Sequence, residues 1–117
     1  MSAAETLTVF RVTVRGRFAD LTEQARSYLS KAAPEHDILL SSYSPEGSLT
    51  YDRAVDFFNI RFELRAAGDN PMEAAGAEGL RETEAFFDTM GWGFRALKVN
   101  VVDMSAMWDD VARRQAL

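Results

Sequence analysis

The stretch Phe57-Phe-Asn-Ile-Arg-Phe-Glu-Leu-Arg-Ala66 decides the fold, because apolar and polar side chains alternate along it. Successive side chains of a β-strand point to opposite faces, so this strand has one apolar face and one polar face. Its apolar side chains are Phe58, Ile60, Phe62 and Leu64. Residues 7–18 repeat the pattern, with Phe10, Val12 and Val14 on the apolar side. A sheet built from such strands must cover one face and offers the other to water, a ligand or a second copy.

The remaining segments supply helices for the apolar face. Asp20-Leu-Thr-Glu23 has the pattern of a capping box, and a helical apolar spacing follows it until Pro34. A second helix is expected from Pro71 to about Met90, with Asn70 as its cap. Further strands are expected at 38–43, 48–52 and 94–103, and a short C-terminal helix with Ser105 as its cap.

This order of strands and helices predicts one α+β domain over residues 1–117. The expected architecture is a ferredoxin-like sandwich, an antiparallel sheet with two helices on one face and a short C-terminal helix. A small α+β roll with the same elements in a different spatial order is the alternative.

Composition excludes several classes of function. The chain has 117 residues, 47% apolar, with a net charge of −5 and no cysteine. The charge argues against nucleic-acid binding, and the lack of cysteine fits a reducing compartment. No apolar run approaches the roughly 18 residues of a membrane span, and the start does not resemble a signal peptide. We therefore expect a cytoplasmic protein without membrane contact. One histidine without cysteine disfavours zinc, so neither a metal nor a cofactor is expected.

The polar face of the sheet is the first candidate site. Guanidinium groups bind carboxylate or phosphate through two parallel hydrogen bonds, so the face could hold an anionic ligand. The expected ligand-binding residues are Arg11, Arg15, Asn59 and Arg61. The alternatives are a solvated face with cross-strand ion pairs, or a face buried against a twin subunit.

A second candidate combines His36, Tyr51 and Asp52 as catalytic residues. His36 is the only histidine, so any imidazole acid–base step must use it. His36 or Asp52 would move a proton, and Tyr51 would stabilise an oxyanion. A solvated loop histidine and a half-buried tyrosine are the structural alternatives.

A third candidate is an apolar pocket walled by Trp92 and Trp108, with Phe94 beside them. Ordinary core packing or a subunit contact is the alternative, because large aromatic side chains usually serve packing.

The pattern as a whole resembles a family of small, uncharacterised actinobacterial proteins with a domain of unknown function. The residues that carry the resemblance are Phe10-Arg-Val-Thr-Val-Arg-Gly-Arg-Phe18, Glu35-His-Asp37, Gly47-Ser-Leu-Thr-Tyr-Asp-Arg53, Phe58 to Phe62, Gly91-Trp-Gly-Phe94 and Asp103-Met104. The resemblance implies a ferredoxin-like fold and a bacterial cytoplasmic setting, and it carries no mechanism.

The leading hypothesis is a small-molecule-binding protein of bacterial specialised metabolism that acts on a polar or anionic substrate. It could be a cofactor-independent enzyme of the cyclase, isomerase or oxygenase type, working as a homodimer; this rests on analogy of fold. The rival hypothesis is a non-catalytic module for dimerisation or protein interaction.

Overall fold

The computed structural model describes residues 7–38 and 42–105. Its elements are β1 (Thr8–Ala19), α1 (Glu23–Ala32), the 3-10 helix η1 (Ala33–His36), β2 (Ser48–Tyr51), β3 (Phe57–Ala66), α2 (Pro71–Met90) and β4 (Gly93–Asp103). The prediction of a mixed α+β fold with an antiparallel sheet and two helices is confirmed.

The four strands form one antiparallel sheet in the order β2-β3-β1-β4. The long central pair β1–β3 aligns Val12 with Phe62 and Val14 with Ile60, so the apolar residues of both strands share a face. Val12 and Val14 are fully buried. The predicted alternation of apolar and polar side chains therefore holds in the folded sheet.

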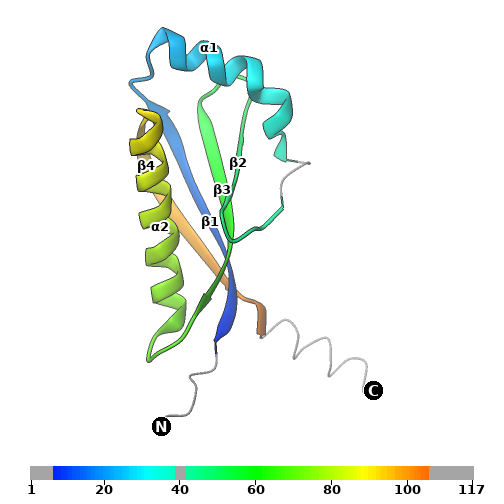
Figure 1. The fold of residues 1–117 in the computed structure, drawn as a ribbon, viewed down its shortest axis with the longest axis vertical. Helices are drawn as coiled ribbons and strands as arrows, with labels where there is room; N and C mark the ends of the chain where they lie inside the picture. The colour runs from blue at the N-terminus through cyan, green and yellow to red at the C-terminus, as the bar shows by residue number, and fades with distance from the viewer. Residues whose placement is uncertain (1–6, 39–41, 106–117) are drawn as a thin grey trace.

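Helix α2 lies along the apolar face, over β4, β1 and β3 (Figure 1). Its glycines allow this close approach. A Cβ atom on Gly79 would lie only 2.7 Å from Cγ1 of Val12, and one on Gly76 would lie 3.1 Å from Cγ2 of Val101. The missing side chains let the helix backbone pack directly on the valines of the sheet.

Helix α1 lies across the end of the strands, where β1 ends and β2 turns into β3 (Figure 1). Its Leu29 is buried, and the Leu29 carbonyl accepts a hydrogen bond of 2.6 Å from the Tyr51 hydroxyl. Arg26 donates to the Ala54 carbonyl at 3.2 Å. Because α1 crosses the end of the sheet, α2 is the element that covers the apolar face along its length.

The start of α1 differs from the expected capping box at Asp20. Asp20 has a φ of 52°, whereas an N-cap residue usually adopts an extended conformation. Thr22 has that conformation, with φ −67° and ψ 159°, and its hydroxyl accepts from the Ala25 N–H at 3.0 Å. The cap is therefore Thr22.

Two other expected elements are affected. The strand expected at 38–43 is wrong for its described residues, because Ile38, Ser42 and Tyr43 are not part of a strand; the single parallel bridge to Phe62 is made by Ser44, just after this range. Residues 39–41 lie outside the described part of the chain. The expected C-terminal helix lies almost wholly in residues 106–117, which are also outside it.

A β-bulge interrupts the β1–β4 pairing. Arg15 pairs with Lys98 and Arg17 pairs with Arg95, so β4 has one more residue than β1 between these pairs. The two β4 residues between these pairs are Ala96 and Leu97, and Ala96 has a φ of 58°. Such a positive φ is typical of the left-handed position in a bulge.

Candidate functional site

The polar face of the sheet gathers cationic side chains. The cations of its strands are Arg11, Arg15, Arg17, Arg61, Arg65, Arg95 and Lys98. Glu63 is the carboxylate that the strands place among them. Helix α2 packs on the other face. The polar face is therefore locally cationic, although the whole chain has a net charge of −5.

At one end of this face, Tyr43 lies between two predicted ligand-binding residues. The guanidinium carbons of Arg11 and Arg61 lie 4.9 Å and 5.4 Å from the centre of its ring. The Tyr43 hydroxyl lies 3.2 Å from Oγ1 of Thr13, so the tyrosine reaches across β3 to β1. The Nε atoms of both arginines are shielded and lack a hydrogen-bond partner among the described residues. Arg11 and Arg61 thus share a face, as predicted, and Tyr43 covers part of it.

Nearer the bulge, a hollow of about 320 Å³ lies between β3, β1 and β4. Its polar lining consists of Arg15, Arg17, Asn59 and Lys98. Nε of Arg15 donates to Oδ1 of Asn59 at 3.0 Å. This bond fixes the plane of the guanidinium group and leaves its two terminal nitrogens available. Two predicted residues, Arg15 and Asn59, therefore meet here.

The charges around this hollow are poorly balanced. Arg15 lies directly across from Lys98, and Arg17 lies directly across from Arg95. Like charges in direct cross-strand register destabilise a sheet. Arg17 has a counter-ion, because its Nη2 lies 3.0 Å from Oδ2 of Asp56, and its guanidinium group lies over the Phe57 ring. For Arg15 and Lys98, no carboxylate contact occurs among the described residues.

The predicted catalytic residues lie elsewhere. Nδ1 of His36 lies 3.0 Å from the Leu49 carbonyl, so this nitrogen donates, and the imidazole ring stacks on Tyr51 at 5.3 Å. The Tyr51 hydroxyl donates to Leu29, and its burial, with the negative charges of Tyr28 and Glu35, raises its pKa above the ordinary value. His36 and Tyr51 are therefore brought together, but on the apolar side of the sheet.

Asp52 has a structural position in the β2–β3 loop. Its Oδ1 accepts from the backbone N–H groups of Asp56 and Phe57, at 2.8 Å and 3.0 Å. It lines a hollow of about 300 Å³, and Tyr51 and Asn59 line the same hollow. The carboxylate holds the loop that carries Asp56, the counter-ion of Arg17.

Trp92 does not wall the cationic hollow. Trp92 is 8% exposed and contacts Phe18, Phe86 and Phe87 in the aromatic core. This core lies on the apolar face, opposite the arginines. Trp108 lies outside the described residues.

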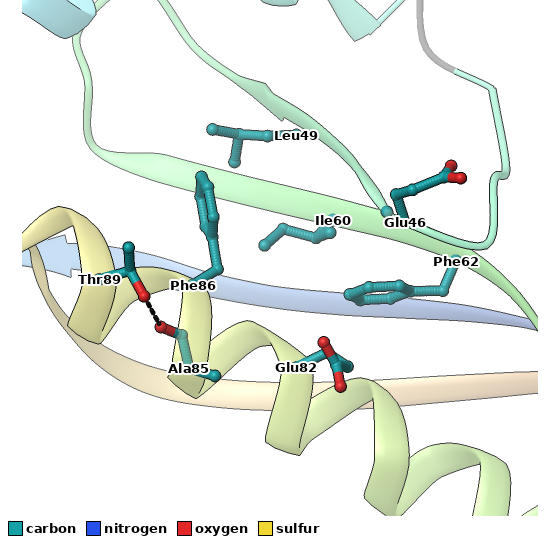
Figure 2. A pocket seen from close by; sticks show the side chains of 9 residues that line it. Glu46, Leu49, Ile60, Phe62, Glu82, Ala85, Phe86 and Thr89 are labelled. Atoms are coloured by element: carbon teal, nitrogen blue, oxygen red, sulfur yellow. Dashed lines mark hydrogen bonds between the residues drawn. The ribbon is translucent and has the colours of Figure 1, made fainter.

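An apolar groove of about 340 Å³ lies between α2 and the β2–β3 pair (Figure 2). Its apolar walls are Leu49, Ile60, Phe62 and Phe86, and its charged residues are Glu46 and Glu82. The sequence interpretation did not include this groove. The groove depends on where α1 lies relative to the sheet, and no local sequence pattern predicts this placement.

Two further residues of the polar face were missed. Arg17 continues the alternation of Arg11 and Arg15, so the pattern could have identified it. Tyr43 follows the 39–41 segment, and only the folded chain places its ring over β3. Within residues 7–38 and 42–105, histidine and acidic side chains form no group of three that could hold a metal. No helix in those ranges is both long and apolar enough to cross a membrane.

The comparisons with known proteins give a family and no activity. No curated protein and no solved structure matches the chain. A family model, described as a family of unknown function (DUF6204), matches residues 2–116. The match covers nearly the whole chain, and the chain therefore belongs to the DUF6204 family.

Proposed function

We propose that this protein binds a small anionic molecule in the hollow lined by Arg15, Asn59 and Lys98. The observation that carries the proposal is the direct cross-strand pair of Arg15 and Lys98 beside this hollow. The two like charges lack a carboxylate contact among the described residues. A bound anion would convert their repulsion into two attractive contacts.

The chemistry of the lining favours a carboxylate or phosphate group. Two parallel N–H donors of one guanidinium group match two oxygens of either anion. Arg15 is oriented by its bond to Asn59, so less side-chain entropy is lost on binding. Lys98 would supply a second positive charge from the neighbouring strand. The hollow of about 320 Å³ suits a small molecule better than a polymer.

Binding is better supported than catalysis. The residues that line the hollow include no histidine and no carboxylate among the described ones. His36 and Tyr51 belong to the opposite side of the sheet. The hypothesis of a cofactor-independent enzyme therefore stays a prediction. Self-association through the cationic face would bring like charges together, which disfavours the rival hypothesis of a dimer through this face.

The ferredoxin-like assignment, the biological setting and the homodimer also remain proposals. The element order β-α-β-β-α-β supports a ferredoxin-like assignment. The actinobacterial and cytoplasmic setting, the role in specialised metabolism and the homodimer stay predictions.

Thermal unfolding of the full chain with citrate and with pyrophosphate tests the anion site. A ligand that binds only the native state raises the free energy of unfolding by about 2.7 kcal/mol at a hundred times its Kd. We expect both anions to raise the Tm by several degrees above sodium chloride of equal ionic strength. The substitution Lys98→Gln should remove most of this shift. Without anion, Lys98→Gln should be at least as stable as the wild type, because one repulsion is gone.

The matched control is Arg81→Gln. Arg81 is exposed on α2, away from the hollow, and its substitution changes the net charge by the same amount. It should leave the anion-induced shift unchanged. An equal shift in Lys98→Gln and wild type would contradict the proposal, as would an equal loss in both variants.

A further inference from the structure

We propose a second binding site, for a small organic cation on an apolar body, in the groove between α2 and the β2–β3 pair. The site is separate from the anion hollow, because it lies on the opposite face of the sheet. It therefore does not depend on the proposed function.

The groove exists because of the way the two helices are placed. Helix α2 covers the apolar face along its length, while α1 lies across its end (Figure 1). The β2–β3 side of this face is left partly open beside α2. The resulting groove of about 340 Å³ has the size of a small-ligand site.

The walls of the groove offer apolar contact from both sides. Ile60 and Phe62 project from β3 and Leu49 from β2, while Phe86 faces them from α2 (Figure 2). Phe86 is 38% exposed, although it contacts Phe87 and Trp92. An apolar ligand body that covers this ring removes hydrocarbon surface from water, which is worth about 25 cal/mol per Å².

A glycine sets the position of one acidic residue. Gly47 has a φ of +92°, and a Cβ atom there would lie 2.5 Å from Cε1 of Phe62. Only glycine lets the turn before β2 approach Phe62 so closely. This approach places the neighbouring Glu46 at the rim of the groove, beside the aromatic wall (Figure 2).

The charge of the groove is complementary to a cation. Glu46 and Glu82 come from opposite walls, and Figure 2 shows both toward the Phe62 end. Neither carboxylate has a hydrogen-bond or ion-pair partner among the described residues, and none of the described lining residues is a lysine or arginine. The faces of Phe62 and Phe86 would also attract an ammonium group. An anion of the same shape would meet two negative charges, so the groove selects for a cation.

An NMR titration of the full chain tests this site with two probes of similar shape. The first is 2-phenylethylamine, which is cationic at pH 7, and the second is 3-phenylpropionate, which is anionic. We expect the amine to shift the amide signals of Leu49, Phe62 and Phe86. The carboxylate should bind at least tenfold more weakly at this site. Equal affinity of the two probes for the groove would overturn the proposal.

Variants that remove charge without changing shape locate the cation. The double substitution Glu46→Gln with Glu82→Gln should weaken amine binding about tenfold, since two exposed ion pairs contribute up to about 1 kcal/mol each. Glu84→Gln is the matched control, because Glu84 is an exposed residue of α2 outside the groove lining. It should leave the Kd unchanged. Lys98→Gln should also bind the amine normally, which separates this site from the anion hollow.

The other possible occupants give distinct results. Light scattering that shows a dimer whose groove signals change on dilution would mean that a second copy fills the groove. Signals of Phe86 that change when residues 106–117 are removed, with amine binding gained only then, would mean that this segment fills it. Either result would overturn the proposal.

Discussion

At the scale of single residues, Tyr51 shows how the folded environment fixes the role of a reactive group. Its hydroxyl donates to the Leu29 carbonyl at 2.6 Å, and His36 stacks on its ring. Burial, then the negative charges of Tyr28 and Glu35, raise the pKa of Tyr51 above its ordinary value of about 10. The phenol therefore stays neutral near pH 7 and connects α1 to β2.

Replacing Tyr51 with phenylalanine tests this role. At pH 7, Tyr51→Phe should lower the free energy of unfolding by about 1–2 kcal/mol, because the Leu29 carbonyl loses its donor. The pKa of Tyr51 is higher in the folded state, so its contribution is fully present below pH of about 10 and is lost as the pH rises through the folded pKa. Urea unfolding at several pH values should show the difference between wild type and variant narrowing in alkali.

Tyr28→Phe is the control for this series. Tyr28 is 58% exposed, and its removal should change stability at pH 7 by less than about 0.5 kcal/mol. A difference between wild type and Tyr51→Phe that stays constant up to pH 11 would contradict the assigned pKa direction.

At the scale of elements, local sequence predicted β1, β3 and both ends of α2, but it misplaced the start of α1. Alternation identified β1 and β3 because one face of each strand is buried. The start of α1 was misplaced because Asp20 and Thr22 are both good capping residues. Only the backbone conformation of the turn, with Asp20 at φ 52°, selects Thr22. The 38–43 segment was misread as a strand because its composition resembles one, while its described residues, Ile38, Ser42 and Tyr43, make no strand pairing and the nearby bridge belongs to Ser44.

The packing of α2 on β1 gives a prediction for this element pair. A valine side chain at Gly79 would overlap Val12, so Gly79→Val should lower the free energy of unfolding by about 2 kcal/mol or more. Ala77→Val is the matched control on the exposed side of the helix, and helix propensity alone predicts a loss of about 0.5 kcal/mol. Chemical denaturation of both variants measures the difference. Equal losses would mean that the helix does not approach the sheet at Gly79.

At the scale of the whole molecule, the sequence predicted which residues share a face but not which sites they form. Arg11, Arg15 and Arg61 lie on one face because strand geometry dictates it. Trp92 was expected beside a ligand, but it lies in the aromatic core, because the end of α2 places it next to Phe87. The groove beside α2 could not be predicted, since it depends on the angle at which α1 crosses the sheet.

Separation of charge between the two sides predicts chromatographic behaviour. Lys98→Gln and Arg81→Gln give the same net charge, but the first removes a cation from the sheet and the second removes one from α2. On a negatively charged resin at about 0.1 M salt, where the Debye length is about 10 Å, Lys98→Gln should elute earlier than Arg81→Gln, because charges beyond about one Debye length contribute little. Identical elution would show that net charge alone governs the interaction.

The additional residue in β4 has a consequence for the cationic face. Arg95 and Lys98 are three positions apart, and in an unbroken strand an odd separation sends two side chains to opposite faces. The irregularity at Ala96 restores the match, so both cations lie with Arg15 and Arg17. Without this irregularity, regular pairing of the present sequence would send either Arg95 or Lys98 toward the hydrocarbon core, whereas deletion of Ala96 would leave the two cations two positions apart and on the same face. The anion hollow therefore depends on the backbone irregularity that accommodates this residue as much as on the charged residues around it.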